Sequence, residues 1–109
     1  MKENGKTTMS HSRQRLIMLM QELNFGWIKG LQIRNGEPVF DPPPQVVRDI
    51  KFGGENGPRQ EMLVEDFTLK SPVVELFELL DSMSDGEVLS LEVKHGLPFR
   101  MSVEEMVQI

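Results

Sequence analysis

A segment that spans about a quarter of this chain recurs once further along it, and no other feature constrains the fold as strongly. Residues 13–41 align with residues 73–101 without a gap. One such unit, a helix followed by a hairpin, cannot bury its apolar face alone, so two units are expected to share one core. The alternative is that any two amphipathic helices leading into hairpins would align as well. Six pairs are identical: Leu16/Leu76, Leu19/Leu79, Gly26/Gly86, Leu31/Leu91, Gly36/Gly96 and Pro38/Pro98.

Apolar residues at spacings of three and four predict a helix at the start of each unit. Ser12 is the expected N-cap of the first helix, and Asn24 followed by Gly26 is its expected end. In the second helix, Ser71 is the expected cap and Pro72 occupies the first helical position, where a missing N–H costs nothing. The predicted core residues are Leu16, Ile17, Met20 and Leu23 in the first helix, and Val73, Leu76, Phe77, Leu80 and Met83 in the second.

Residues 27–40 and 88–101 are predicted to form hairpins. Their turns are Asn35-Gly36 and His95-Gly96, because both positions of a two-residue hairpin turn need residues that tolerate a positive φ. These elements predict an α+β fold in which two helix–hairpin (αββ) repeats form a mostly antiparallel sheet of four or more strands, with two helices on one face.

The domain organisation follows from the repeat. Residues 1–11 are polar and are predicted to be a disordered tail. Residues 12–109 are predicted to form a single domain, built of repeat unit 12–41, connector 42–70 and repeat unit 71–109. In the connector, Asp41 and the three prolines after it are expected to be a stiff spacer or a sheet edge, and residues 45–52 a short strand.

The first unit has a helix ending in an aromatic-glycine pair, then a strand and an Xaa-Gly hairpin, marked by Phe25, Gly26, Ile33, Gly36 and Val39. In these residues it resembles the YezD-like domain of very short, uncharacterised bacterial proteins. The second unit shares the layout but has Asp85-Gly86 in place of the aromatic-glycine pair. The resemblance implies a duplicated small bacterial domain, and it carries no known activity.

Composition excludes several classes of protein. The chain has no cysteine, which excludes a disulfide scaffold and a cysteine-based metal or redox site. Its longest apolar run covers positions 16–20, far short of the about 20 residues that cross a bilayer as a helix. No leader sequence opens the chain, so a cytoplasmic location is expected and no membrane partner.

Charge is distributed unevenly along the chain. Residues 1–60 carry nine basic and six acidic side chains, a net of +3, whereas residues 61–109 carry three basic and eleven acidic, a net of −8. Halves of opposite charge favour association between copies, so a homodimer or another protein partner is expected. The alternative is a nucleic-acid-binding module that uses the basic first half. The candidate partner-binding residues are Trp27, Arg34, Arg48, Lys51 and Arg59. The favoured interpretation of the aromatic residues is that Trp27 and Phe25 lie in the core at the helix–hairpin corner, with the cations solvated or paired with the acidic half.

Catalysis has little support in the sequence. His95 is the only histidine outside the expected tail, and a residue before Gly96 in a hairpin turn needs the left-handed φ that histidine tolerates. Residues 53–58 with Arg59 could cradle an anion, but a connecting loop is the favoured interpretation. No catalytic residue, cofactor or metal site is predicted. The sequence therefore favours a small, non-catalytic interaction or assembly module that pairs through a sheet edge or a helix face.

Overall fold

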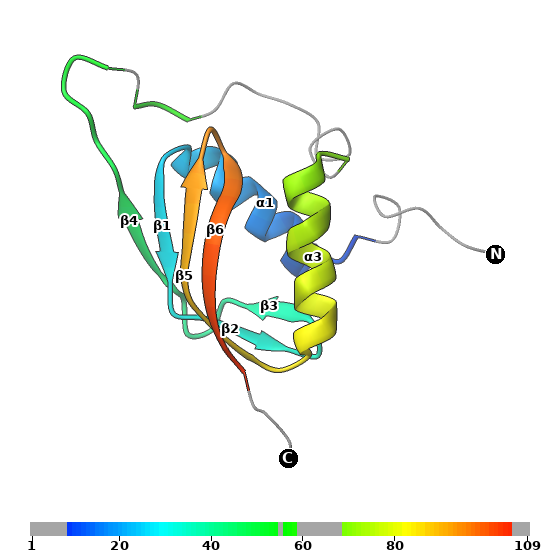
Figure 1. Cartoon of the computed structure of the whole chain (residues 1–109). Coiled ribbons are helices and arrows are strands. Elements are labelled where there is room, and N and C mark those ends of the chain that lie inside the picture. The colour runs from blue at the N-terminus through cyan, green and yellow to red at the C-terminus, as the bar shows by residue number, and fades with distance from the viewer. Residues whose placement is uncertain (1–8, 55, 59–68, 106–109) are drawn as a thin grey trace.

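The computed structural model describes residues 9–54, 56–58 and 69–105. The six strands of this part form one sheet whose pairings are all antiparallel, and both helices lie on the same face of it (Figure 1). The predicted α+β class is confirmed. In chain order the elements are α1 (His11–Leu23), β1 (Gly26–Lys29), β2 (Leu31–Arg34), β3 (Glu37–Val39), β4 (Gln45–Arg48), α3 (Ser71–Met83), β5 (Gly86–Lys94) and β6 (Leu97–Glu105).

Helix α1 begins earlier than the sequence indicated. The hydroxyl of Ser10 accepts a hydrogen bond from the backbone amide of Arg13 at 3.2 Å and caps the helix, whereas Ser12 lies within the first turn. The prediction of Ser12 as the cap is wrong because two serines of the same chemistry flank the helix start. His11, assigned to the tail, is the first helical residue, and residues 1–8 of that tail lie outside the described residues.

Helix α3 starts at Ser71, with Lys70 at the cap position and Pro72 in the first turn, so the expected cap is one residue late. Lys70 makes no side-chain capping bond. Both helices end alike, because Asn24 and Ser84 adopt positive φ values of 64° and 66° and turn the chain toward the sheet. All nine predicted core residues of the two helices are buried.

Strand β5 lies at the centre of the sheet. Its two halves pair with β2 and then β1 on one side, and it pairs with β6 along its length on the other. Gly30, with φ of 74°, lies between β1 and β2, the two strands that pair with the same side of β5. The segment 27–40, predicted to be one hairpin, therefore contains three strands, and only β2 and β3 form a hairpin with each other. Both predicted turns are confirmed, with φ of 56° and 76° at Asn35 and Gly36, and 56° and 75° at His95 and Gly96.

Aligned positions of the two units have equivalent partners in the centre of the sheet. Gly26 pairs with Val93, and its counterpart Gly86 pairs with Ile33, the counterpart of Val93. Exchanging the two units therefore leaves the central pairing unchanged. The remaining central pairs follow the same rule: Trp27 with Glu92 and Glu87 with Gln32, Ile28 with Leu91 and Val88 with Leu31.

The outer strands of the two units differ. Gly26 pairs with Arg48 in β4, whereas Gly86 pairs with Glu105 in β6. Continuing the alignment would make Gln108 the counterpart of Arg48, so the partner of Gly86 comes three positions earlier than the repeat requires. The first unit thus has three additional residues, and they fall in the gap between β3 and β4 that contains Pro42-Pro43-Pro44.

The connector 42–70 contributes β4 to the sheet, as expected for a short strand, although only residues 45–48 of the predicted 45–52 belong to it. Residues 59–68 of the connector lie outside the described residues.

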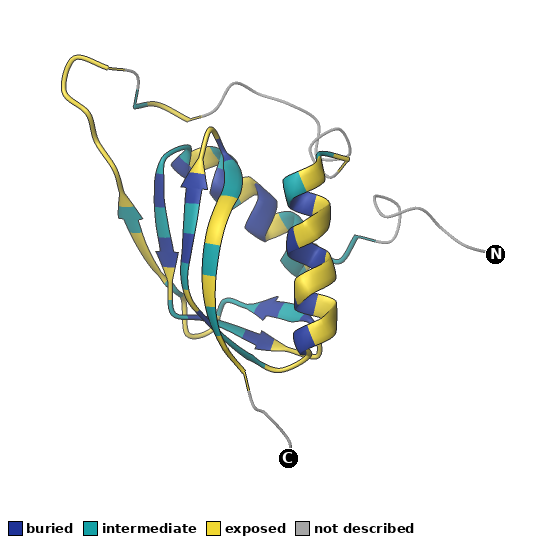
Figure 2. Ribbon diagram, in the orientation of Figure 1, coloured by how far each residue is buried: buried dark blue, intermediate teal, exposed yellow. Residues whose placement is uncertain are grey.

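The core lies between the helices and the sheet, where dark blue marks the facing sides of α1, α3 and the central strands (Figure 2). The sheet contributes alternate residues to this core, as strand geometry requires. Strand β6 is mostly exposed or half-buried. The sheet residues of the core are Ile28, Leu31, Ile33, Val88, Leu91 and Val93.

Candidate interaction surface

Trp27 lies on the face of the sheet opposite the helices. Its neighbours Gly26 and Ile28 are buried, so strand alternation directs the indole to the open face. There it is half-buried, with Val47 and Glu92 as its cross-strand partners. The interpretation that placed Trp27 in the core at the helix–hairpin corner is therefore wrong.

Positively and negatively charged side chains share this open face with Trp27. Arg34 lies exposed at the end of β2, but it shares the face with acidic residues of the neighbouring strands. The face is therefore a mixed surface and not a basic platform. By strand alternation its charged members are Lys29, Arg34, Glu87, Glu92, Lys94, Arg100 and Glu104. Glu37 lies opposite Arg34 in the ladder, but its carboxylate accepts hydrogen bonds from Ser10 and Ser12 at the start of α1.

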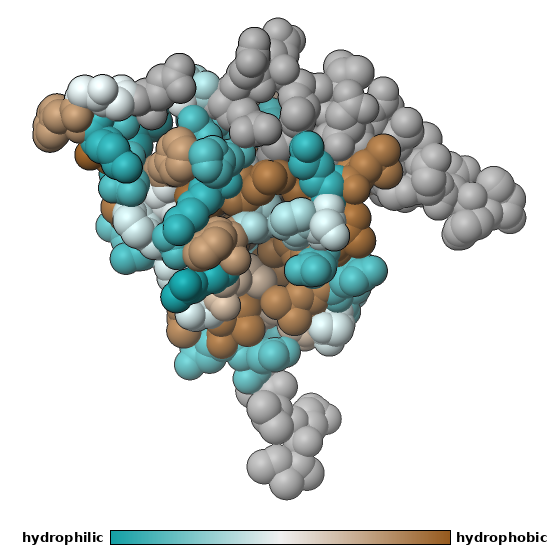
Figure 3. All heavy atoms as spheres, turned by 45° about the horizontal axis from the view of Figure 1, so that its top comes forward, coloured by the Kyte–Doolittle hydropathy of each residue, from teal (hydrophilic) through white to brown (hydrophobic). Residues whose placement is uncertain are grey.

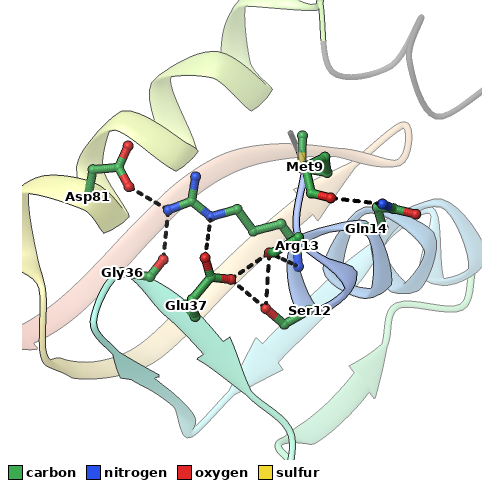
Figure 4. A network of polar contacts seen from close by, with 8 residues as sticks. Met9, Ser12, Arg13, Gln14, Gly36, Glu37 and Asp81 are labelled. Carbon is green, nitrogen blue, oxygen red and sulfur yellow. Dashed lines mark hydrogen bonds and ion pairs between the residues drawn. The ribbon is translucent and has the colours of Figure 1, made fainter. Parts of the chain in front are cut away.

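Two cations of the first half serve other contacts. Arg13 is only 16% exposed and ties α1 to both halves of the fold (Figure 4). Its guanidinium donates to the carbonyl oxygen of Gly36 at 2.8 Å, pairs with Asp81 of α3, and lies 3.8 Å from Glu37. The guanidinium of Arg15 lies over the ring of Phe40 at 4.8 Å. The fold therefore disperses the basic residues of the first half.

An arm of residues 49–54 follows β4 and projects from the body of the molecule (Figure 1). Asn56 braces its turn, because its side chain accepts from the amide of Lys51 and donates to the carbonyl oxygen of Lys51, both at 2.9 Å. Phe52 at the tip is 95% exposed. The arm reaches the upper left of the space-filling view, where hydrophobic and hydrophilic side chains lie together at the surface (Figure 3).

The candidate residues Arg34, Arg48 and Lys51 thus lie at three separate places: the end of β2, the end of β4 and the arm. Arg59, the fifth candidate, lies outside the described residues. The glycine loop leading to it is described in part, and Asn24 donates to the carbonyl oxygen of Gly57 at 3.1 Å. This bond ties the loop to the end of α1.

The two edges of the sheet differ in how well they are protected. The first edge consists of the short strands β3 and β4, separated by a segment with three prolines that have no N–H to donate. The second edge is β6, a continuous strand of 9 residues. Within the described part of the chain β6 pairs with β5 alone. Its outer row of backbone groups is open to a further strand.

The edge β6 also carries an unfavourable pair of like charges. Glu104 lies directly opposite Glu87 of β5, and no ion pair joins either of them to another described residue. Like charges in directly opposite positions destabilise a sheet. Earlier on the same strand, Arg100 is exposed and its Nε lies 3.7 Å from Glu92 Oε1. A cation and an anion therefore stand on the same face of one open strand.

Among the described residues no group of three or more histidine, cysteine, aspartate or glutamate side chains is placed to hold a metal ion. His95 occupies its turn with a positive φ and contacts Phe25, whose ring centroid is 4.9 Å away. No helix of the described ranges has the length and apolar character to cross a membrane.

No family model, curated protein or solved structure matches this chain. The resemblance of the first unit to the YezD-like domain therefore stays a prediction from the sequence.

Proposed function

We propose that this protein is an interaction module without catalytic activity that associates with a second copy of itself through the outer edge of β6. The observation that carries the proposal is the difference between the two edges. One edge is broken by three prolines, whereas β6 is a strand of 9 residues that keeps residues 100–105 in sequence beyond its proline and its extra residue at Phe99. Natural proteins block edges that are not to be paired, so the less protected edge is the one available for pairing. We also propose, as the sequence predicts, that the protein is bacterial and cytoplasmic.

We also propose that the chain is an internal duplication of one helix–hairpin unit. The equivalent pairings of Gly26 with Val93 and of Gly86 with Ile33 support it, as do the nearly equal φ values of the two turns. In this view β5 and β6 form the continuous hairpin of one unit. The same hairpin in the other unit is broken at Gly30 and at the prolines. The two units would then have diverged so that only the second keeps an edge able to pair.

Nucleic-acid binding through the basic first half is the less favoured function. Counterion release on binding nucleic acid needs clustered Lys and Arg side chains. Arg13 pairs with Asp81, and Arg15 lies over the ring of Phe40. Lys29 and Arg34 share their face of the sheet with glutamates. The dispersed cations therefore favour a protein partner.

The test is the absolute mass in solution, by light scattering on a sizing column, over about 10 to 200 µM protein. This range suits a small interface, whose dissociation constant we expect to be on the order of micromolar. The expected result is a dimer at low salt and a smaller dimer fraction at about 0.5 M salt, where exposed charges are screened. A monomer at every concentration overturns self-association. Salt-dependent binding of a single-stranded oligonucleotide by that monomer would favour the second function instead.

A further inference from the structure

We infer that two copies pair their β6 strands antiparallel with Ser102 opposite Ser102 of the second copy. In this register Arg100 of each copy lies opposite Glu104 of the other, and Met101 lies opposite Val103. The inference rests on the proposed self-association and specifies its geometry. It follows from the regularity of β6, from the faces of its side chains, and from its charges.

Strand β6 is regular over the residues that this register uses. The ladder with β5 has an extra β6 residue at Phe99, between the pairs Glu92–Arg100 and Val93–Pro98. The second irregularity of the ladder is an extra residue on β5, Leu89, between the pairs Val88–Val103 and Ser90–Ser102. From Arg100 to Glu105 the β6 residues themselves follow one another without a further insertion. The register therefore uses the consecutive residues 100–104 and avoids Pro98, which lacks an N–H to donate.

The side chains of β6 alternate between the two faces in the way that self-pairing requires. Arg100, Ser102 and Glu104 are exposed, and they lie opposite Glu92, Ser90 and Glu87 of β5. Residues directly opposite each other in an antiparallel pair point to the same face. Pairing Ser102 with itself therefore keeps both helix layers on one side, about a two-fold axis perpendicular to the sheet. On the helix side, the half-buried Met101 and Val103 would cover each other.

The register also relieves the repulsion described above. Glu104 faces Glu87 within the chain, and the second copy would add Arg100 on its other side. Arg100 is 73% exposed and contacts Glu92 only through Nε at 3.7 Å, so its guanidinium has donors left for a second carboxylate. Across the dimer the charges would alternate, with two Arg–Glu pairs related by the two-fold axis. Opposite charges in directly opposite positions stabilise a sheet.

The neighbouring registers lack this complementarity. If the two-fold axis passed at Arg100 instead of Ser102, Arg100 of one copy would lie opposite Arg100 of the other. An axis at Met101 would place Pro98 opposite Glu104, and an axis at Val103 would leave Arg100 without a carboxylate opposite it. Like-charge contacts of this kind are how interfaces reject a wrong register. Only the centre at Ser102 pairs both charges.

Charge exchange at these two positions tests the register. Arg100→Glu and Glu104→Arg each create two like-charge contacts per dimer, so we expect dimerisation to weaken at least about tenfold in either variant. The double variant Arg100→Glu/Glu104→Arg restores both pairs and should regain the mass of the wild type. An equimolar mixture of the two single variants should form a heterodimer, since each chain then opposes only the other sign. Glu105→Arg, which makes the same charge change beyond the paired residues, is the matched control and should remain dimeric.

Urea unfolding separates dimerisation from folding. Glu104→Arg places a cation opposite Glu87, so its fold should be at least as stable as that of the wild type while its dimer is lost. If Arg100→Glu and Glu104→Arg remain dimeric, or if the double variant and the mixture stay monomeric beside a dimeric wild type, this register is wrong and self-association uses another register or another surface. If the wild type itself is monomeric, both the register and the proposed function fail.

Discussion

The backbone amide of Gly96 donates a hydrogen bond to the carbonyl oxygen of Asn24 at 2.9 Å, and so joins the turn of the second hairpin to the end of the first helix. Gly36 makes the corresponding contact with Ser84 at 2.7 Å. Beside these bonds, Asn35 donates its amide to the carboxylate of Asp85 at 2.7 Å. Each half therefore supplies the group that satisfies the helix end of the other, and neither half holds these contacts alone.

Gly36→Ala should reduce the free energy of unfolding by about 1 to 2 kcal/mol, because Gly36 has φ of 76° and an L side chain is strained there. The added methyl would also lie 3.3 Å from Asp81 Oδ1 and 3.4 Å from the carbonyl oxygen of Leu80. Urea titration measures the loss. The control is Gly57→Ala, whose methyl meets no atom of the described residues within 4 Å. An equal, small effect of both substitutions would contradict the role given to the turn.

Gly26→Ala should detach β4 from β1. A methyl group at Gly26 would overlap the carbonyl oxygen of Val47, and it would lie 3.0 Å from Leu23 Cδ1. We expect a loss of more than about 2 kcal/mol of stability, as is usual where the backbone must shift. Hydrogen exchange reports on the strand directly, because the amide of Asp49 donates to the carbonyl oxygen of Phe25 at 3.0 Å and should exchange faster. Unchanged protection of the Asp49 amide would show that the strands adjust without separating.

Arg13→Leu should destabilise the fold by about 1 to 3 kcal/mol, since the carbonyl oxygen of Gly36 loses a charged donor. The guanidinium also lies 5.0 Å from the ring centroid of Phe77, a cation–π contact that leucine cannot make. The matched control is Arg15→Leu, where an exposed arginine on the same helix is lost. Arg15→Leu loses only an exposed cation–π contact with Phe40, so we expect it to cost less than about 1 kcal/mol. Similar urea midpoints for the two variants would show that the contacts of Arg13 add little.

Asn56→Ala should loosen the arm without affecting the core. The substitution removes both side-chain bonds to Lys51, so the amide of Lys51 should exchange faster with solvent while core amides of β5 stay protected. Phe52→Ser, at a side chain that is 95% exposed, should change global stability by less than about 0.5 kcal/mol. A large loss of stability in either variant would mean that the arm packs on the body in solution.

The sequence predicted the elements that depend on local chemistry. Apolar spacing identified the buried residues of both helices, because a helix repeats its faces every three or four residues wherever it packs. Asn35-Gly36 and His95-Gly96 identified both turns, because a positive φ at two consecutive positions suits few residue types. The cap at Ser12 was wrong because nearby serines offer the same hydroxyl, and only the path of the chain before the helix distinguishes them.

Contacts between distant segments were decided by the tertiary structure. The break at Gly30, the pairing of β4 with β1, and the place of Trp27 on the open face all depend on which strand lies alongside which. The same is true of the β6 edge, since its openness is a property of the neighbours it lacks among the described residues. Turn and helix signals act over a few residues, whereas strand partners are chosen by burial of the shared core. The sequence by itself therefore determined the two helices and the two hairpin turns, and only the packing of the strands decided which of the two sheet edges is left open in the described part of the chain.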